Sequence, residues 1–100
     1  MSTESYIKYY VKVANTDIAS SRFYLDTLTV EEFIFELQCV GANALNIEYD
    51  MVEVVEAGQE INNVKPEDAP KLEPDNITMV EKYGSRLKQG YTAFYLRKAQ

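Results

Sequence analysis

The segment that most constrains this chain is residues 29–40 (TVEEFIFELQCV), because it carries the signals of an amphipathic helix together with both of its ends. Thr29 can accept a hydrogen bond from the backbone of the third helical residue, and Glu32 can bond back to the backbone of Thr29, which makes a capping box. Gly41 suits the left-handed residue that ends many helices. We therefore expect a helix over 29–40 that stops at Gly41.

This helix is expected to have two unequal faces. Its main apolar residues recur with the spacing of a face that packs on a core. The inward set is Val30, Phe33, Ile34 and Leu37. Phe35 and Cys39 lie four residues apart and point away from that set, so they are candidates for contact with a partner protein. The alternative is that a loop folds over them and covers them.

Two segments before the helix predict an antiparallel hairpin. Residues 6–13 and 22–28 are rich in aromatic and β-branched side chains, and turn-forming residues 15–17 lie between them. Alternation along the second segment separates two faces. One face carries Phe23, Leu25 and Leu28, and the other carries Arg22, Tyr24 and Asp26.

After the helix, residues 45–49 and 51–57 predict one or two strands, and residues 91–98 predict a last one. Residues 62–76 hold all three prolines and predict a loop.

The stretch 77–89 is ambiguous. Asn76 or Thr78 could cap a short helix there, and Gly84 interrupts it.

This order of elements predicts a single α+β domain over residues 1–100. One helix can cover one face of a mixed sheet of four or five strands, which is a roll of the β-grasp type. We expect the last strand to run parallel to the first at the centre of the sheet, and the loop at 62–76 to be an insertion. A ferredoxin-like sandwich would need a second full helix, for which 77–89 is the candidate.

The composition argues against catalysis. The chain has no histidine and one cysteine, so the usual general base, the Ser-His and Cys-His pairs and the commonest metal ligand are missing. Four carboxylates alternate along the strands after the helix without the looped spacing of a cation site. They are Glu48, Asp50, Glu53 and Glu56. We therefore expect no enzyme activity, no metal and no cofactor.

The net charge of −6 is distributed unevenly. Residues 31–81 hold thirteen acidic and two basic residues, whereas residues 82–100 hold five basic residues and no acidic one. This asymmetry indicates either opposed surfaces that orient a partner or a plain solvated surface. A nucleic-acid partner is not expected, because an acidic chain repels phosphate.

The sequence shows no signal for secretion or membrane insertion. No apolar run approaches the roughly 18 residues of a membrane-spanning helix, and the first residues lack a signal-peptide pattern. A single cysteine suits a reducing compartment. We expect a location in the cytoplasm or the nucleus and no membrane partner.

Four stretches, in register along nearly the whole chain, carry a family resemblance. They are Tyr10 to Val13, Thr29-Val30-Glu31 with Phe33, Leu37 and Gln38, Val54 to Ile61 with its Ala-Gly turn, and a closing segment with Thr78-Met79, Tyr83-Gly84, Leu87, Gly90, Thr92 and Leu96-Arg97. Together they resemble ubiquitin and the ubiquitin-like domains. The resemblance implies a β-grasp fold and a role in binding other proteins.

The chain departs from that family in three places. The connection over 61–78 is longer than usual, and Glu56 stands where the family has a large apolar residue. The chain ends Arg97-Lys98-Ala99-Gln100 without the diglycine that a conjugated modifier needs. Conjugation is therefore not expected, unless the chain is a truncated modifier.

The resemblance also implies candidate binding residues. Ubiquitin-like domains commonly carry an apolar patch on the sheet face opposite the helix, and the alignment assigns Val55 and Leu96 to it. Phe94 shares a face with Leu96 and is a candidate as well. A slip of one residue in the last strand would exchange the faces and bury both, in place of Ala93 and Tyr95. The alternative for Val55 is burial beneath the inserted loop. Lys12 is a candidate through a similarity to Phox-and-Bem domains, in which an acidic segment meets a first-strand lysine.

We therefore expect a non-catalytic module that binds another protein. The alternatives are a structural or assembly subunit, viral or part of a larger complex, and a truncated modifier. The sequence leaves the oligomeric state open.

Overall fold

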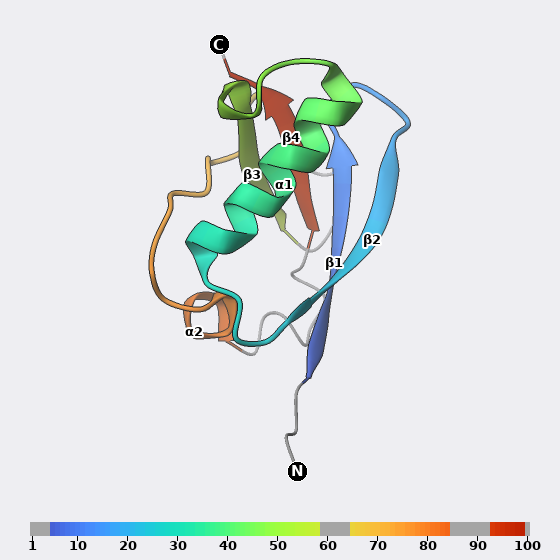
Figure 1. Ribbon diagram of the computed structural model, residues 1–100. Coiled ribbons are helices and arrows are strands. Elements are labelled where there is room, and N and C mark those ends of the chain that lie inside the picture. The colour runs from blue at the N-terminus through green and yellow to red at the C-terminus, as the bar shows by residue number, and fades with distance from the viewer. Residues whose placement is uncertain (1–4, 59–64, 85–92, 100) are drawn as a thin grey trace.

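Four strands and one long helix organise the computed structural model of this chain, which describes residues 5–58, 65–84 and 93–99 (Figure 1). The elements in chain order are β1 (Tyr6–Val13), β2 (Ala19–Leu25), α1 (Val30–Leu45), the 3-10 helix η1 (Tyr49–Met51), β3 (Val52–Gly58), α2 (Met79–Tyr83) and β4 (Ala93–Lys98). The strands form one sheet in the order β2-β1-β4-β3, and α1 lies across one face of it.

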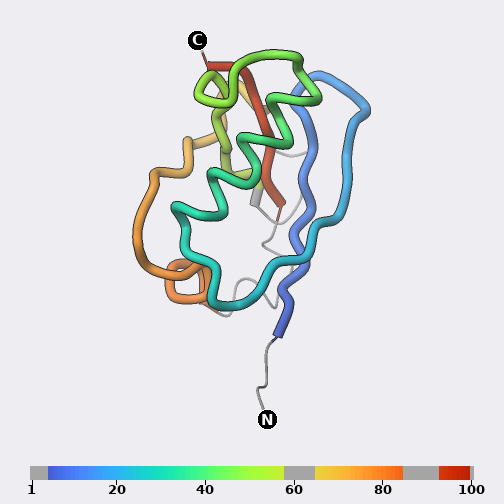
Figure 2. The backbone as a smooth tube through the Cα atoms, viewed as in Figure 1, coloured from blue at the N-terminus to red at the C-terminus, as the bar shows by residue number. Residues whose placement is uncertain are grey.

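The central pair of the sheet is parallel, as the sequence predicts. β1 pairs with β4 in parallel, with Val11 beside Phe94 and Val13 beside Leu96. The two outer pairings, β1 with β2 and β3 with β4, are antiparallel. The backbone trace shows β1 beginning at one end of the molecule and β4 finishing at the other (Figure 2). The α+β roll with a mixed sheet is thereby confirmed, and residues 91–92 of the expected last strand lie outside the described residues.

α1 begins as predicted. The Thr29 side chain accepts a hydrogen bond from the Glu32 backbone N–H (3.2 Å), and the Glu32 carboxylate accepts one from the Thr29 backbone N–H (3.0 Å). The short helix α2 also has its predicted ends. Thr78 Oγ1 accepts a hydrogen bond from the Glu81 N–H (3.0 Å) at its start, and Gly84 follows its last residue with a φ of 56°.

The expected stop at Gly41 is wrong. α1 continues to Leu45 and ends at Asn46, which takes the left-handed conformation instead. Gly41 is buried inside the helix, where a Cβ atom would lie 2.6 Å from Cγ1 of Val52. The glycine is therefore needed for the close approach of α1 to β3.

The hairpin also differs from the expectation. β2 covers Ala19–Leu25, three residues earlier than expected, and no strand forms over 45–49. Tyr24, not Phe23, packs on the helix side, where its ring lies 6.0 Å from that of Tyr9. The reason is register: Tyr24 is directly opposite Ile7, and opposite residues of an antiparallel pair share a face.

Apolar side chains are buried on both faces of the sheet. The main core lies between the sheet and α1. Its buried residues are Tyr9, Val11, Val13, Val30, Phe33, Leu37, Val52, Val54, Leu72, Met79, Tyr83, Phe94 and Leu96. A smaller cluster lies on the opposite face and consists of Val55, Ala57, Ala69, Ala93 and Tyr95.

The small cluster is closed by residues 65–72, which we call the covering segment. Its last residues run along the outer edge of β3: the Glu56 N–H donates to the Pro70 carbonyl (3.0 Å), and the Leu72 N–H donates to the Val54 carbonyl (2.8 Å). Glu56, the unexpected acid beside the turn, accepts a hydrogen bond from the hydroxyl of Tyr83.

Candidate functional site

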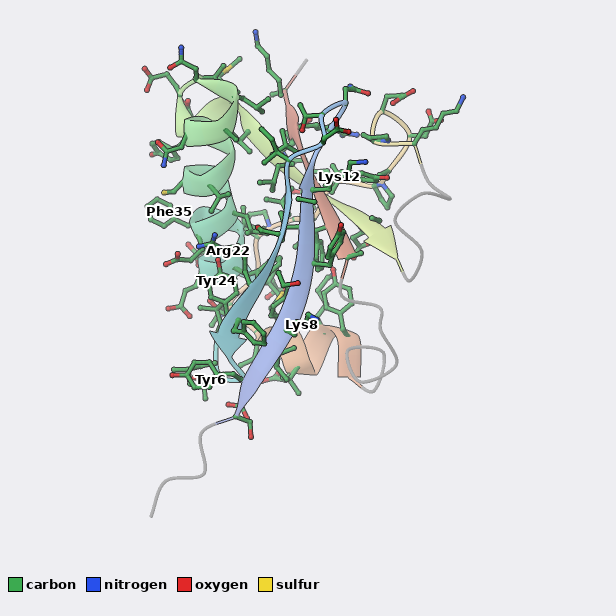
Figure 3. All side chains as sticks on the ribbon, turned by 90° about the vertical axis from the view of Figure 1, so that its right-hand side faces the viewer. Tyr6, Lys8, Lys12, Arg22, Tyr24 and Phe35 are labelled. Carbon is green, nitrogen blue, oxygen red and sulfur yellow. The ribbon has the colours of Figure 1, made fainter. Side chains whose placement is uncertain are left out.

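The six candidate residues fall into a buried group and an exposed group. Val55 is 0% exposed beneath the covering segment, as the alternative reading anticipates, and Phe94 and Leu96 are buried in the main core. A partner could touch these three only after the structure opened. Lys12 is half-buried, and Phe35 and Cys39 are exposed. Figure 3 shows Phe35 on the outer side of α1 and Lys12 beyond the other face of the sheet.

Phe35 borders a groove of about 630 Å³ between α1, the start of β3 and the end of the covering segment, which we call the α1–β3 groove. Its apolar lining is Leu28, Ile34, Phe35, Val52, Val54, Leu72, Pro74 and Ala99. Phe35 is 53% exposed, and its ring meets that of Tyr49, itself 50% exposed, edge to face at 5.8 Å. Two half-exposed aromatic rings therefore stand at the side of an apolar groove.

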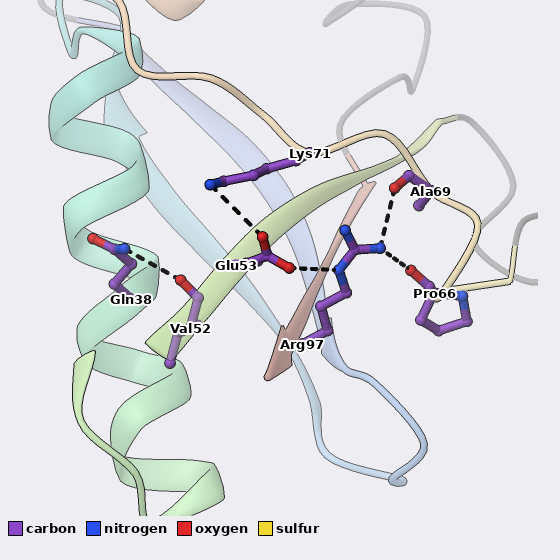
Figure 4. A network of polar contacts seen from close by, with 7 residues as sticks. All are labelled: Gln38, Val52, Glu53, Pro66, Ala69, Lys71 and Arg97. Atoms are coloured by element: carbon purple, nitrogen blue, oxygen red, sulfur yellow. Dashed lines mark hydrogen bonds and ion pairs between the residues drawn. The ribbon is translucent and has the colours of Figure 1, made fainter. Parts of the chain in front are cut away.

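The bottom of the groove is held by polar contacts (Figure 4). The Gln38 amide donates to the Val52 carbonyl (3.2 Å), so the first backbone carbonyl on the outer edge of β3 is satisfied by α1. Glu53 accepts from Nε of Arg97 (3.1 Å) and lies 3.6 Å from Nζ of Lys71. These contacts tie α1, β4 and the covering segment to the same strand.

The rim of the groove is acidic. Five carboxylates line it, together with the single cation Lys71. They are Glu31, Glu32, Glu36, Asp50 and Glu53. Glu53 is neutralised by its two cations, and Glu32 is engaged by Thr29, whose backbone and side-chain hydrogen bonds lower the pKa of the Glu32 carboxyl. Glu31, Glu36 and Asp50 have no ion-pair partner within 5–58, 65–84 and 93–99, so the rim keeps a negative field.

Comparison with known proteins identifies the architecture. No protein-family model matches the chain. No curated protein matches it significantly. Among solved structures, all of this chain aligns with 93% of the C-terminal ubiquitin-like domain of mouse tubulin-specific chaperone e, at a TM-score of 0.58 and 12% sequence identity. The chain has the ubiquitin-like fold.

This chain of ubiquitin-like fold differs from the binding site that the resemblance of its sequence implies. The sheet face opposite α1 is partly closed over β3 and β4 by the covering segment, which buries Val55. The exposed aromatic residues at a groove lie on the helix side instead. Helical spacing alone singles out Phe35, and three acids of the rim lie on the same helix. Tyr49, Asp50 and Glu53 are brought to it by the chain reversal through η1.

Sequence reasoning missed the α1–β3 groove as a whole. Its walls come from α1, β3, residues 71–74 and Ala99, which are far apart in sequence. The excess of acids over 31–81 was the available signal, because these residues form most of the rim. In the part of the chain that the structure describes, no helix is long and apolar enough to cross a membrane.

Proposed function

We propose that this ubiquitin-like domain is a non-catalytic module that binds another protein through the α1–β3 groove. The observation that carries the proposal is the exposed pair Phe35 and Tyr49 beside an apolar groove with an acidic rim. Half-exposed aromatic side chains at a concave apolar surface are typical anchors of protein interfaces.

The charge of the rim indicates the partner. The rim carboxylates that have no ion-pair partner among the described residues attract basic side chains. The occupant is therefore a basic segment of another protein with an apolar residue that reaches the floor of the groove. The net charge of −6 favours a protein over a nucleic acid. A chain without histidine is suited to binding and not to acid–base catalysis, and one cysteine suits the cytoplasm or nucleus.

The test uses a short peptide in which arginine alternates with leucine, followed by amide chemical shifts of the full chain. We expect shifts in α1 and at the start of β3. Phe35→Ala should weaken binding by about tenfold or more, as loss of a buried aromatic anchor does. Phe23→Ala is the matched control, because Phe23 is similarly exposed on β2, away from the groove.

A second pair of variants separates the rim from the overall charge. Glu36→Lys changes the rim and Glu67→Lys changes an exposed acid of the covering segment, so both alter the net charge equally. We expect Glu36→Lys to weaken binding more. Equal losses, or shifts that centre on β2, would argue against the groove.

An assembly subunit is the second candidate. The observation that favours it is the outer edge of β2, which pairs with no other strand among the described residues and lies on the side of the sheet away from β3. The mass of the chain in solution distinguishes the two candidates, because a stable homo-oligomer at micromolar concentration would favour the assembly subunit.

A further inference from the structure

The two edges of the sheet differ in the hydrogen bonding of their outward-facing backbone groups. The outer edge of β3 is bonded by Pro70, Leu72 and the side chain of Gln38. β2 forms the other edge and has only β1 as a neighbour among the described strands. Its outer side is therefore a row of backbone groups available to a further strand.

The pairing of β2 with β1 determines which of these groups face outward. The Val13 N–H donates to the Ile18 carbonyl (2.9 Å), and the Asp26 N–H donates to the Ser5 carbonyl (2.8 Å). Because antiparallel bonding alternates along a strand, the even-numbered residues of β2 bond to β1. The odd-numbered residues Ala19, Ser21 and Phe23 direct their N–H and carbonyl groups to the outer edge, whereas the Leu25 carbonyl accepts from the Leu28 N–H (3.1 Å).

This edge lacks the features that keep strands apart. β2 contains no proline, and its register with β1 runs without a bulge. Its one charged residue, Arg22, is engaged by the hydroxyl of Tyr24 (2.8 Å). Two large apolar side chains at this edge are exposed, Phe23 at 60% and Ile18 at 52%.

We propose that two copies of the chain pair β2 with β2, antiparallel, about a two-fold axis at Ser21. Such an interface is isologous and closes as a dimer. The sheet then runs through both copies, with both α1 helices on the same face. This proposal goes beyond the α1–β3 groove and does not depend on it, because the groove lies at the opposite edge.

The position of the axis follows from the side chains. An axis at Arg22 would set two guanidinium groups directly opposite each other, which is unfavourable. An axis at Phe23 would leave Ile18 beyond the paired residues.

An axis at Ser21 avoids both problems. It places Phe23 opposite Ala19 of the second copy and Ile18 opposite Tyr24, so the two exposed apolar side chains are covered. Arg22 then lies opposite the small Ser20. The pairs centred on Ser21 also match the outward-facing backbone groups, because Ala19, Ser21 and Phe23 all bond across the interface.

The mass of the full chain in solution tests the dimer. We expect a concentration-dependent dimer by sedimentation. Phe23→Lys should raise its dissociation constant by about tenfold or more, whereas Phe35→Lys, an equal charge change at an exposed phenylalanine of α1, should not. Ser21→Pro removes only an outward-facing N–H, so it should separate the copies without breaking the bonds to β1.

Cross-linking tests the axis. In a Cys39→Ser background, cysteine at position 21 should form a disulfide between copies, because bonded antiparallel pairs have Cα atoms about 5.5 Å apart, within disulfide range. Cysteine at position 22 or 23 should not. A disulfide at either of those positions in place of 21 would overturn the axis. A monomer at all concentrations, or one whose β2 amides respond only to a foreign extended peptide, would overturn the dimer.

Discussion

Tyr9 is the largest of the fully buried side chains, and it brings a polar hydroxyl into the core. Its ring lies 4.7 Å from that of Phe33 and 6.2 Å from that of Phe94, measured between centroids. Its hydroxyl is buried and has no hydrogen-bond partner in the described ranges. Burial raises the pKa of Tyr9 to about 12 from 10.0. The buried ring of Tyr9 thus stabilises the fold, whereas burial of its hydroxyl group destabilises it.

Tyr9→Phe should therefore keep or raise the stability of the domain. Removing a buried hydroxyl without a partner recovers a desolvation cost of about 1–3 kcal/mol, less the cavity that the lost oxygen leaves. The free energy of unfolding in urea measures the change. A loss of stability would show that the hydroxyl is bonded in solution.

The raised pKa of Tyr9 also predicts how the stability of the domain changes at alkaline pH. The folded pKa is the higher one, so the stability that depends on neutral Tyr9 is complete below pH 10 and is lost as the pH rises through about 12. Tyr9→Phe should lose less stability over that interval than the wild type. Tyr10→Phe, on the other face of β1, serves as the control and should fall with the wild type.

At the scale of elements, local signals predict where helices begin better than where they end. The capping box of α1 and the Thr78 cap of α2 are each made within four residues, so the sequence contains all that they need. The end of α1 depends on Val52, a residue of β3 that approaches Gly41 in space. A glycine that permits a close contact and one that ends a helix look the same in a sequence.

The faces of β2 show the same limit. Alternation is visible in the sequence, but the face that turns inward is decided by register with β1. The inserted prolines are visible too. The burial of Val55 beneath the covering segment instead needs two hydrogen bonds to β3, in which the Pro70 carbonyl accepts from the Glu56 N–H and the Leu72 N–H donates to the Val54 carbonyl. The candidate site was therefore predictable as far as Phe35 on α1, and not as a groove.

Arg97 is the side chain that joins the covering segment to β4. One guanidinium nitrogen donates to the carbonyls of Pro66 (2.6 Å) and Ala69 (3.2 Å), while Nε bonds to Glu53. The side chain is 19% exposed, so these charge-assisted bonds are partly shielded from water. A lysine cannot make this set of contacts, because it lacks the planar fork.

Arg97→Lys should accordingly release the covering segment while the sheet and α1 stay folded. We expect a loss of about 1–3 kcal/mol, seen as faster hydrogen exchange at the Glu56 and Leu72 amides, which bond across to the segment and to β3 respectively. Lys98→Arg at the exposed neighbouring position is the control. Equal acceleration in α1 would mean global destabilisation instead.

At the scale of the whole molecule, the charges and the open edge lie on opposite sides. The acidic rim surrounds the α1–β3 groove, and β2 presents backbone groups with one engaged arginine. The two proposed surfaces thus bind through different interactions. The groove attracts its partner by charge, and the edge of β2 binds a second copy by backbone hydrogen bonds. A single chain can use both at once, since β2 and β3 are the two ends of the sheet.

Added salt should separate these two activities. Raising the salt concentration shortens the screening length from about 10 Å at 0.1 M to about 3 Å at 1 M. Binding of the arginine-leucine peptide should weaken several-fold over that range, whereas the β2 dimer should change little. Isothermal titration for the peptide and sedimentation for the dimer measure the two effects. A dimer that dissociates at high salt would show that charges, and not the strand edge, hold the two copies together.

The parallel pair at the centre of the sheet has a consequence for synthesis. β1 and β4 are neighbours in space, yet residue 13 lies opposite residue 96. When a ribosome makes this chain, β1, β2, α1 and β3 all emerge before the strand that must lie between β1 and β3. Such distant pairings fold slowly and leave apolar strands unpaired in the meantime. During synthesis the sheet therefore cannot be completed until β4, which ends at residue 98, has left the exit tunnel.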